Sequence, residues 1–561
     1  MTKKTSYSPT QVAKYLASAP KAVKTYITDL EEQISNLSQI GLALSKERDM
    51  SKLLEMILLE AKRISNSDGG TLYMMTDDKR LKFEIMMTDS LNFHMGGTSG
   101  EDIPFYPVKL YDDDGEPNNT MVAAYVGLTG ETVNIEDAYK ADGFDFSGTK
   151  MFDEKTGYHS KSFLTVPLKN HEDEIIGVLQ LLNAQTSKNK KIIEFTGEIQ
   201  GKVEALASQA AVAITNKNLI KDLENLFESF IKLIASAIDA KSPYTGGHCE
   251  RVPEITMMLA EAVHETNSGP FADFKLTDQE MYELKIAAWL HDCGKVATPE
   301  FVVDKSTKLE TIYDRIHEVE TRFVVLQRDY EIKKLKTELS IERDSSLTIK
   351  EKKERIRALQ NDYKKMIRKI KKELLFVKES NIGGEFMSDD KKQKIHDISK
   401  YRWKPNGKMQ NFLSEDEIYN LTIPRGTLTP EERQVINDHI VVTINMLDEL
   451  PYPKHLRNIP EFAGGHHEKL DGTGYPKGLT KNEMSVQARI MAIADIFEAL
   501  TARDRPYKKG KTLSQAMRIL GFMKDDAHID VDLFDIFVKK KIYMKYAKGF
   551  LEPEQIDEVT L

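Results

Sequence analysis

Cysteine is scarce in this sequence. Cys249 and Cys293 are the only two cysteines among 561 residues, too few for a disulfide framework and suited to a reducing compartment. Long apolar runs are missing as well. We find no stretch of about 18 apolar residues that could cross a membrane, and the first twenty residues lack the continuous apolar core of a signal peptide. These absences predict a cytoplasmic protein without a membrane-spanning segment.

An excess of positive charge is also missing. Lys and Arg number 79 against 88 Asp and Glu, a formal net charge of −9, which argues against a protein that coats nucleic acid or another polyanion. Apolar residues make up 40% of the chain and charged residues 30%, an ordinary balance for folded soluble domains. A chain of this length has room for about three or four structural units.

The amino-terminal part, residues 1–45, is predicted to be helical. Its apolar positions alternate in steps of four and three, the spacing of a coiled-coil seam: Val23, Ile27, Leu30, Ile34 and Leu37. Two interpretations remain open, a coiled coil that joins two copies of the chain and a helix that packs on its own domain.

Residues 46–190 have a different pattern of predicted secondary structure from this helix. The helical segment SKLLEMILLEAKRISNSDGG is followed by short β-like runs such as GTLYMMT, LKFEIMM and SFLTVPL. The segments TGETVNIEDAY, FDEKTGYHSKSFLTVPL and EIIGVLQLLNA resemble those of GAF domains. This resemblance implies an α+β sensor domain, which either binds a small-molecule ligand or serves only as a dimerising scaffold.

Two further helical regions follow. A connecting helix is predicted over 191–238, again with apolar positions four and three apart: Leu219, Leu223, Leu226, Phe230 and Leu233. It would either transmit a movement between domains or act as a spacer.

From Leu309 onward, two seams flank the polar RDSSLT and predict an antiparallel helical hairpin, inserted at about 309–420. The first seam starts at Ile312 and Ile316. The second arm is strongly basic, but a charge run on an amphipathic helix is usually a solvated face, so we do not expect nucleic acid as a partner.

Histidine and aspartate gather in three motifs with apolar surroundings. AAWLHDCGK contains His291 and Asp292, AGGHHEKLDGTGYPKGL contains His466 and His467, and ARIMAIADIFEAL contains Asp495. Ionisable side chains in such surroundings are costly to desolvate unless they are paired or bind a metal. One His-Asp pair alone would more often be structural, but two dyads together with Asp495 favour a bound cation.

In their order along the chain, HDCGK, HHEKLDGTGYP and ARIMAIADIFEALTARDRPYK resemble the motifs of HD-GYP phosphodiesterases, a branch of the HD-domain metal hydrolases. The resemblance implies an all-α HD-GYP domain over 239–540, interrupted by the hairpin and followed by a tail, 541–561. The fold class is thus multidomain, an α+β GAF domain before an all-α domain. The resemblance further implies two divalent transition-metal ions, with Asp292 bridging them and the ligands His248, His291, Asp292, His439, His466, His467 and Asp495.

The motifs leave two questions: which of two histidines binds the metals, and whether a third metal binds. His439 lies eleven residues after Leu428, the interval that the family pattern favours, whereas His317 lies eight residues after Leu309. We therefore assign His439 to the metals and His317 to the hairpin. Some family members hold a third metal with a glutamate four residues before the first histidine; this chain has Tyr244 there, which favours two metals.

The expected chemistry follows from these residue types. Two divalent cations about 3.5–4 Å apart can activate a shared water for attack on a phosphodiester, and an imidazole-rich site favours Fe or Mn over Mg. Asp292 and Lys295 are the expected catalytic residues. Lys295, three residues after Asp292, is expected to contact phosphate, and the resemblance implies the same for Arg505 and Lys508, although Arg505 could instead form a surface salt bridge. The DGTGYP loop either brings Tyr475 to the substrate or props up the histidines as a structural turn.

The resulting hypothesis is a GAF-regulated phosphodiesterase of a cyclic dinucleotide. By resemblance the first substrate is cyclic di-GMP, opened to linear pGpG, which a second cut would convert to GMP. Cyclic GMP-AMP is the alternative, because the motifs concern the phosphates more than the bases. The rivals are a non-catalytic sensor or scaffold and a phosphohydrolase of ordinary nucleotides, which would lack the DGTGYP loop. A homodimer through the helical seams is also expected.

Overall fold

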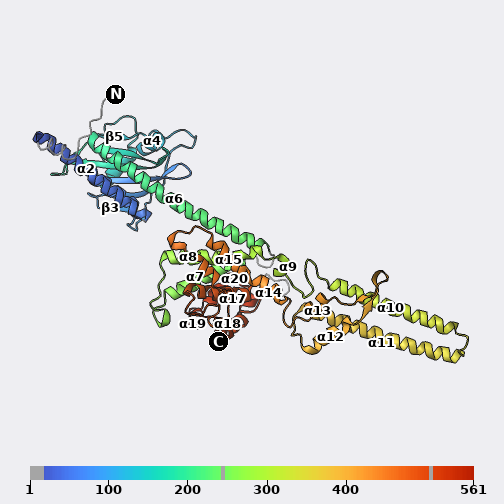
Figure 1. Cartoon of the computed structure of the whole chain (residues 1–561). Helices are drawn as coiled ribbons and strands as arrows, with labels where there is room; N and C mark the ends of the chain where they lie inside the picture. Colours follow the sequence, from blue (N-terminus) through green and yellow to red (C-terminus); the bar gives the residue numbers. More distant parts are fainter. Residues whose placement is uncertain (1–17, 48, 242–246, 504–509, 561) are drawn as a thin grey trace, which may run out of the picture. The chain divides into compact units, whose positions relative to one another are not determined.

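The computed structural model describes residues 18–47, 49–241, 247–503 and 510–560 (Figure 1). The chain divides into two compact units, Met1–Leu226 and Phe227–Leu561. Within the described ranges, no helix combines the length and the apolar character that crossing a membrane requires.

The first unit is built on one antiparallel β-sheet with the strand order β3-β2-β1-β7-β6-β5, in which β4 pairs with β2 and β8 with β7. The strands are β1 (Ser67–Met75), β2 (Arg80–Thr88), β3 (Phe93–Gly96), β4 (Val108–Lys109), β5 (Val133–Ile135), β6 (Phe163–Lys169), β7 (Ile175–Gln185) and β8 (Ile192–Ile193). The helices are α2 (Lys21–Lys46), α3 (Met50–Ser65), α4 (Val122–Thr129), α5 (Ser147–Thr156) and the start of α6 (Gly197–Lys241). The expected α+β architecture is confirmed.

Helices cover both faces of this sheet. Successive residues of a strand point to opposite faces, and on β1 Leu72 packs with α3 and α6, whereas Tyr73 packs with α4. The approach of α3 is close, because a Cβ on Gly70 would lie 2.7 Å from Leu58 Cδ1. A side chain at this position would force Leu58 to shift.

The seam predicted near the amino terminus is described only in part. Residues 1–17 and the side chains of Leu30, Ile34 and Leu37 lie outside the described residues. Near the end of α2, Ile40 and Leu44 are buried in the same core as α3. This half of the helix therefore packs on its own domain.

The second unit is mostly helical, as expected. Its helices outside the insertion are α7 (His248–His264), α8 (Asp278–Leu290), α9 (Glu300–Val303), α14 (Pro430–Asn437), α15 (His439–Asp448), α16 (Ile459–Gly464), α17 (Val486–Thr501), α18 (Leu513–Asp525), α19 (Val531–Lys539) and α20 (Ile542–Phe550). Short 3-10 helices are η1 (Gly269–Phe271), η2 (Cys293–Ala297), η4 (Lys454–Leu456) and η5 (Pro553–Gln555). The main core is formed by α7, α8, the end of α6, and α16 to α20.

The insertion contains a helical hairpin with a core of its own. Helices α10 (Ile316–Arg343) and α11 (Ile349–Ile382) lie side by side and antiparallel (Figure 1), and Thr348 caps α11 in a capping box with Glu351. The remaining elements are α12 (Asp389–Ser399), β9 (Arg402–Trp403), η3 (Pro405–Gly407), β10 (Gln410–Asn411) and α13 (Glu415–Leu421). Phe323, Ile370 and Phe412 are buried in this second core.

Three details differ from the sequence-based expectations. Ile312, placed in the first seam, is 91% exposed because α10 starts only at Ile316. The connecting helix runs over Gly197–Lys241 instead of 191–238, because Ile192–Ile193 pairs with the sheet as β8. The predicted tail contains α20, whose Ile542 and Tyr546 are buried in the main core, so an amphipathic helix stands where no element was expected.

Candidate metal centre

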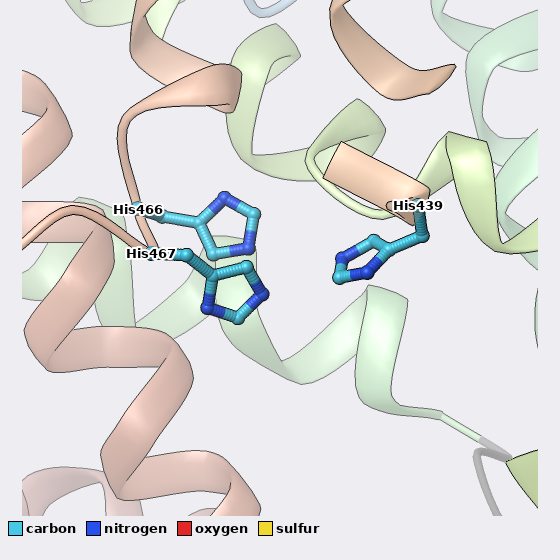
Figure 2. A group of neighbouring side chains, drawn as sticks. All are labelled: His439, His466 and His467. Atoms are coloured by element: carbon cyan, nitrogen blue, oxygen red, sulfur yellow. The ribbon is translucent and has the colours of Figure 1, made fainter. Parts of the chain in front are cut away.

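The seven side chains predicted as metal ligands converge in the second unit. His248 opens α7, His291 and Asp292 follow α8, His439 opens α15, His466 and His467 follow α16, and Asp495 lies within α17. Three overlapping groups of these side chains each have their ligand atoms within 4.8 Å of one another. Figure 2 shows one such group, in which the rings of His466 and His467 face that of His439.

Asp292 lies at the centre of the group. Its Oδ2 is 3.2 Å from the Nε2 atoms of both His248 and His291, and its Oδ1 is 3.1 Å from Nε2 of His439. Asp495 Oδ1 lies 3.2 Å from Nε2 of His248. The carboxylate of Asp292 therefore stands between histidines contributed by three different helices.

Backbone carbonyls orient three of the histidines in the same way. The Nδ1 atoms of His291, His439 and His466 lie 2.7, 2.5 and 2.5 Å from the carbonyl oxygens of Ala288, Ile436 and Ala463, each three residues earlier. A carbonyl only accepts, so Nδ1 carries the proton and Nε2 keeps its lone pair. Each Nε2 is thereby presented to the centre in the form that binds a metal.

His248 is oriented by a side chain that the sequence analysis missed. Its Nδ1 hydrogen-bonds Glu498 Oε2, and Arg251 Nε donates to Glu498 Oε1 at 2.6 Å. Glu498 lies one turn after Asp495 on α17, and its side chain is buried. The argument that an isolated carboxylate on an apolar helix needs a partner, applied to Asp495, would also have found Glu498.

Three buried atoms of the group have no hydrogen-bond partner: Asp292 Oδ1, His439 Nε2 and His466 Nε2. The pair of Asp292 and His439 is close but not in hydrogen-bond geometry. A buried polar atom without a partner costs about 1–3 kcal/mol, and three such atoms in one place would be expensive. All three are metal-ligand atoms facing the centre, so the residues fit divalent cations.

The charge states of His466, His467 and Asp495 fit cations, whereas burial at His248 is outweighed by the charge of Glu498, which raises the pKa of His248 well above its usual range. Burial lowers the pKa of His467 to about 4 and, together with the neighbouring His467 and His291, holds the pKa of His466 well below its usual range. Burial disfavours ionised Asp495, but hydrogen bonding and charge from His248 outweigh this effect and lower its pKa. Neutral imidazoles and ionised carboxylates are the forms that bind metals.

Lys295 and Tyr475 border this group. Lys295 Nζ lies 2.5 Å from Asp292 Oδ2; burial works against its charge, but Asp292 outweighs burial and raises the pKa of Lys295 to about 12. The Tyr475 ring stacks on His467, with centroids 4.9 Å apart. The DGTGYP loop is held by buried Glu468, whose carboxylate accepts from the N–H groups of Lys477 and Leu479 at 2.7 and 2.9 Å.

One glycine of the HDCGK motif has a packing role. A Cβ on Gly294 would lie 2.0 Å from the carbonyl oxygen of His439, and its N–H donates to Thr443 Oγ1 at 2.9 Å. The turn after Asp292 can approach α15 only because this position has no side chain.

His317, assigned to the hairpin, is not part of this group. His317 lies in the insertion, where its side chain is 76% exposed and pairs with Glu320, while His439 is buried among the ligands. Arg505 and Lys508, expected to contact phosphate, lie outside the described residues, as does Tyr244.

Comparisons with known families identify both domains. Residues 49–214 match the GAF domain model and residues 415–533 match the HD domain model. The two units thus each contain a region that matches a domain family. The HD match includes His439, His466, His467 and Asp495 and begins at α13, the last helix of the insertion, so that His248, His291 and Asp292 precede it.

Curated relatives are similar over short segments. A 3′3′-cGAMP-specific phosphodiesterase of Vibrio cholerae serotype O1 is 37% identical over 107 residues, 19% of this chain and 22% of the relative. A cyclic di-GMP phosphodiesterase of Thermotoga maritima is 41% identical over 93 residues, 17% of this chain and 25% of the relative. A cyclic di-GMP phosphodiesterase of Pseudomonas aeruginosa is 45% identical over 74 residues, which are 13% of this chain and 17% of the relative. The chain thus spans a quarter or less of the length of these relatives.

A solved structure is similar to part of the chain. The GAF domain from an Acinetobacter phosphoenolpyruvate-protein phosphotransferase is 17% identical, with a TM-score of 0.25, and the match covers 34% of this chain and 98% of that one.

Proposed function

We propose that the second unit is an HD-GYP-type, metal-dependent phosphodiesterase that hydrolyses a cyclic dinucleotide. The observation that carries this proposal is the convergence of seven side chains that could bind a metal. Three of their ligand atoms are buried and have no hydrogen-bond partner. The relatives named as cyclic-dinucleotide phosphodiesterases support the same reaction class.

Two divalent cations would be held by His248, His291, Asp292, His439, His466, His467 and Asp495. When bound, they would supply Lewis-acid activation of a water and of the phosphodiester. Imidazole-rich sites suit Fe or Mn. The chain's own residues contribute orientation and charge: carbonyls and Glu498 hold the histidines, and Lys295 stays protonated beside Asp292, where its ammonium can bind a phosphate oxygen.

The HD-GYP subtype is supported by the DGTGYP loop beside the metal ligands. Glu468 holds the backbone after Tyr475, and the ring of Tyr475 lies flat against His467. A planar group in this place could contact a purine or brace the histidine. Cyclic di-GMP, opened to pGpG and then to GMP, is the first proposed substrate and cyclic GMP-AMP the second, because relatives are named for each.

The test is anaerobic turnover of cyclic di-GMP and cyclic GMP-AMP in parallel, with Fe(II) or Mn(II) supplied and products separated by chromatography. Asp292→Ala removes the central carboxylate and should abolish both metal content and hydrolysis, whereas His317→Ala, an exposed histidine, serves as the matched control. A fully metallated, active Asp292→Ala variant would overturn the assignment. Wild-type protein that binds both metals and both nucleotides without turnover would instead indicate a sensor.

We further propose that two copies of the chain associate through α6 in the cytoplasm. Leu219, Leu223, Leu226, Phe230 and Leu233 are each more than half exposed and four and three residues apart. The next position upstream in this pattern is Asn216, also exposed, and a single asparagine in such a seam fixes the register of a dimer. Leu223→Glu should convert a dimer into a monomer in light scattering, whereas Lys217→Glu should not.

Both cysteines are free and buried, as suits a reducing compartment.

Regulation by the GAF domain, with or without a small-molecule ligand, is part of the same proposal. Its support is the single helix α6, whose first turns pack in the core of the first unit and whose last turns pack in the core of the second.

A further inference from the structure

The last turns of α6 are built into the second unit beside the metal ligands. Ile231, Ala235 and Ile238 are buried in its main core. Beyond them, Asp239 and Lys241 contact two segments that carry ligands, the start of α7 and the turn after Asp292.

Asp239 supplies the cap that α7 lacks. The helix starts at His248, and its N-cap residue, Gly247, offers no side chain to the first N–H groups, which need acceptors. Asp239 Oδ2 accepts from the N–H of Gly247 at 2.9 Å and from the N–H of Cys249 at 3.2 Å. These are the N–H groups on either side of His248, so α6 fixes the backbone of this ligand.

Lys241 binds the other segment. Helix η2 begins directly after Asp292, and Lys241 Nζ donates to the carbonyls of Lys295 at 3.2 Å, Thr298 at 2.7 Å and Val296. A cation at the carboxyl end of a helical turn satisfies carbonyls that have no partner within the turn. An ammonium has three donors, and here three carbonyls accept from it.

We propose that Asp239 and Lys241 are positioning residues, through which the end of α6 sets the spacing of His248 and Asp292 and thereby the metal affinity. The inference deepens the proposed function, on which it rests. Asp292 Oδ2 and His248 Nε2 lie 3.2 Å apart, and a movement of α6 would shift the backbones of both. A signal from the first unit would then act on metal binding before it acts on turnover.

The test is Mn(II) affinity of the full chain, measured by calorimetry, with turnover as a second readout. Lys241→Met removes the three donors and keeps the alkyl chain. We expect Mn(II) binding weaker by about tenfold, the size of effect seen for residues that orient ligands, and at least partial recovery in Lys241→Arg. Lys232→Met is the matched control: it lies on the same helix, half exposed, with its contacts to Glu228 and Trp289, and should change the affinity less than twofold.

The outcomes separate the two proposals. A folded Lys241→Met protein with wild-type Mn(II) affinity would overturn the inference and leave the proposed function standing. Wild-type protein that binds no Mn(II) or Fe(II) would overturn the proposed function and the inference with it. If Lys241→Met fails to fold, Asp239→Asn, which keeps an acceptor oxygen but no charge, decides the question by the same measurement, and unchanged affinity would again count against the inference.

Discussion

Two of the places where the second unit buries polar side chains differ in whether those side chains have hydrogen-bond partners. In the insertion (residues 309–420), the Arg322 guanidinium donates to both carboxylate oxygens of Glu417, at 2.6 and 2.8 Å, and no buried side-chain polar atom of its described residues lacks a partner. In the metal centre, Asp292, His439 and His466 each leave one buried atom without a partner.

This difference distinguishes buried polar groups that stabilise the fold from buried polar groups that are available to bind a ligand. A satisfied buried pair holds its helices together without any ligand. Unsatisfied atoms of about 1–3 kcal/mol each weaken the fold unless something binds to them, and here they face one another. Removing a satisfied group should therefore cost stability, and removing an unsatisfied one should cost metal binding.

The largest effect is expected at His439. His439→Ala should lose one metal per chain, and turnover should fall by about a hundredfold or more, because the Nε2 that faces Asp292 is gone. Metal analysis together with turnover checks this outcome. His317→Ala should match wild type; an inactive His317 variant beside an active His439 variant would reverse the assignment.

A smaller effect on the metal is expected at Glu498. Glu498→Gln keeps the shape but removes the charge that orients His248, so Mn(II) affinity should weaken by about 10–100-fold. Glu417→Gln makes the same change at a buried carboxylate of the insertion. It should lower the thermal midpoint of the insertion and leave Mn(II) affinity unchanged. Equal losses of Mn(II) affinity in the two variants would contradict the comparison.

The base of the insertion, where Lys308 joins the residues just before it to those just after it, should become more stable as the pH rises. Lys308 is buried and donates to the carbonyls of Leu421 and Ile423 at 3.1 and 2.8 Å; burial, and then the charge of Lys391, lowers its pKa to about 8. An unfolded lysine keeps a pKa of about 10.4. Between these two values the unfolded chain binds the extra proton, so stability rises with pH, by at most about 3 kcal/mol.

Fluorescence can measure this rise. The chain has two tryptophans, and Trp403 packs against the core of the insertion, so urea unfolding in a Trp289→Phe background reports on the insertion. Lys308→Met should abolish the rise between about pH 8 and about pH 10. An unchanged rise in that variant would assign it to other groups.

The smallest effect is expected from shortening the hairpin. Lys334 Nζ lies 5.1 Å from the ring centroid of Tyr363 on the opposite arm, and the residues between these two positions contribute nothing to the described core of the insertion. Replacing 335–362 with two glycines should leave metal content and turnover within about twofold of wild type, because the cost of closing a loop depends only weakly on its length. Loss of metal from a folded variant would make the arms part of the site.

Sequence motifs located side chains that the structure brings together, because metal chemistry restricts the residue types that can form such a group. His291, His466 and Asp495 stand out as ionisable groups in apolar runs, and all three reach the centre. The carbonyls behind the histidines could not be predicted, since they depend on backbone geometry and not on residue identity. Glu498 was within reach of the same reasoning that found Asp495.

The sequence predicted the main elements of the fold but not all of their details. Periodicity located α10 and α11 and the turn between them, but the exposure of Ile312 depends on where α10 begins. The burial of Lys308 could not be foreseen, because a lysine is usually solvated and this one donates to carbonyls more than a hundred residues away. The core position of α20 was missed because no motif draws attention to it.

The chain order of the ligands has a consequence for biosynthesis. His248 and Glu498 hydrogen-bond although 250 residues separate them, and the insertion lies between them. At about 5–20 residues per second, a ribosome adds Glu498 roughly 10–50 s after His248. For much of that interval the nascent chain carries His248, His291 and Asp292 without the histidines that complete the group. A metal held by all seven side chains could bind only after α17 has left the exit tunnel.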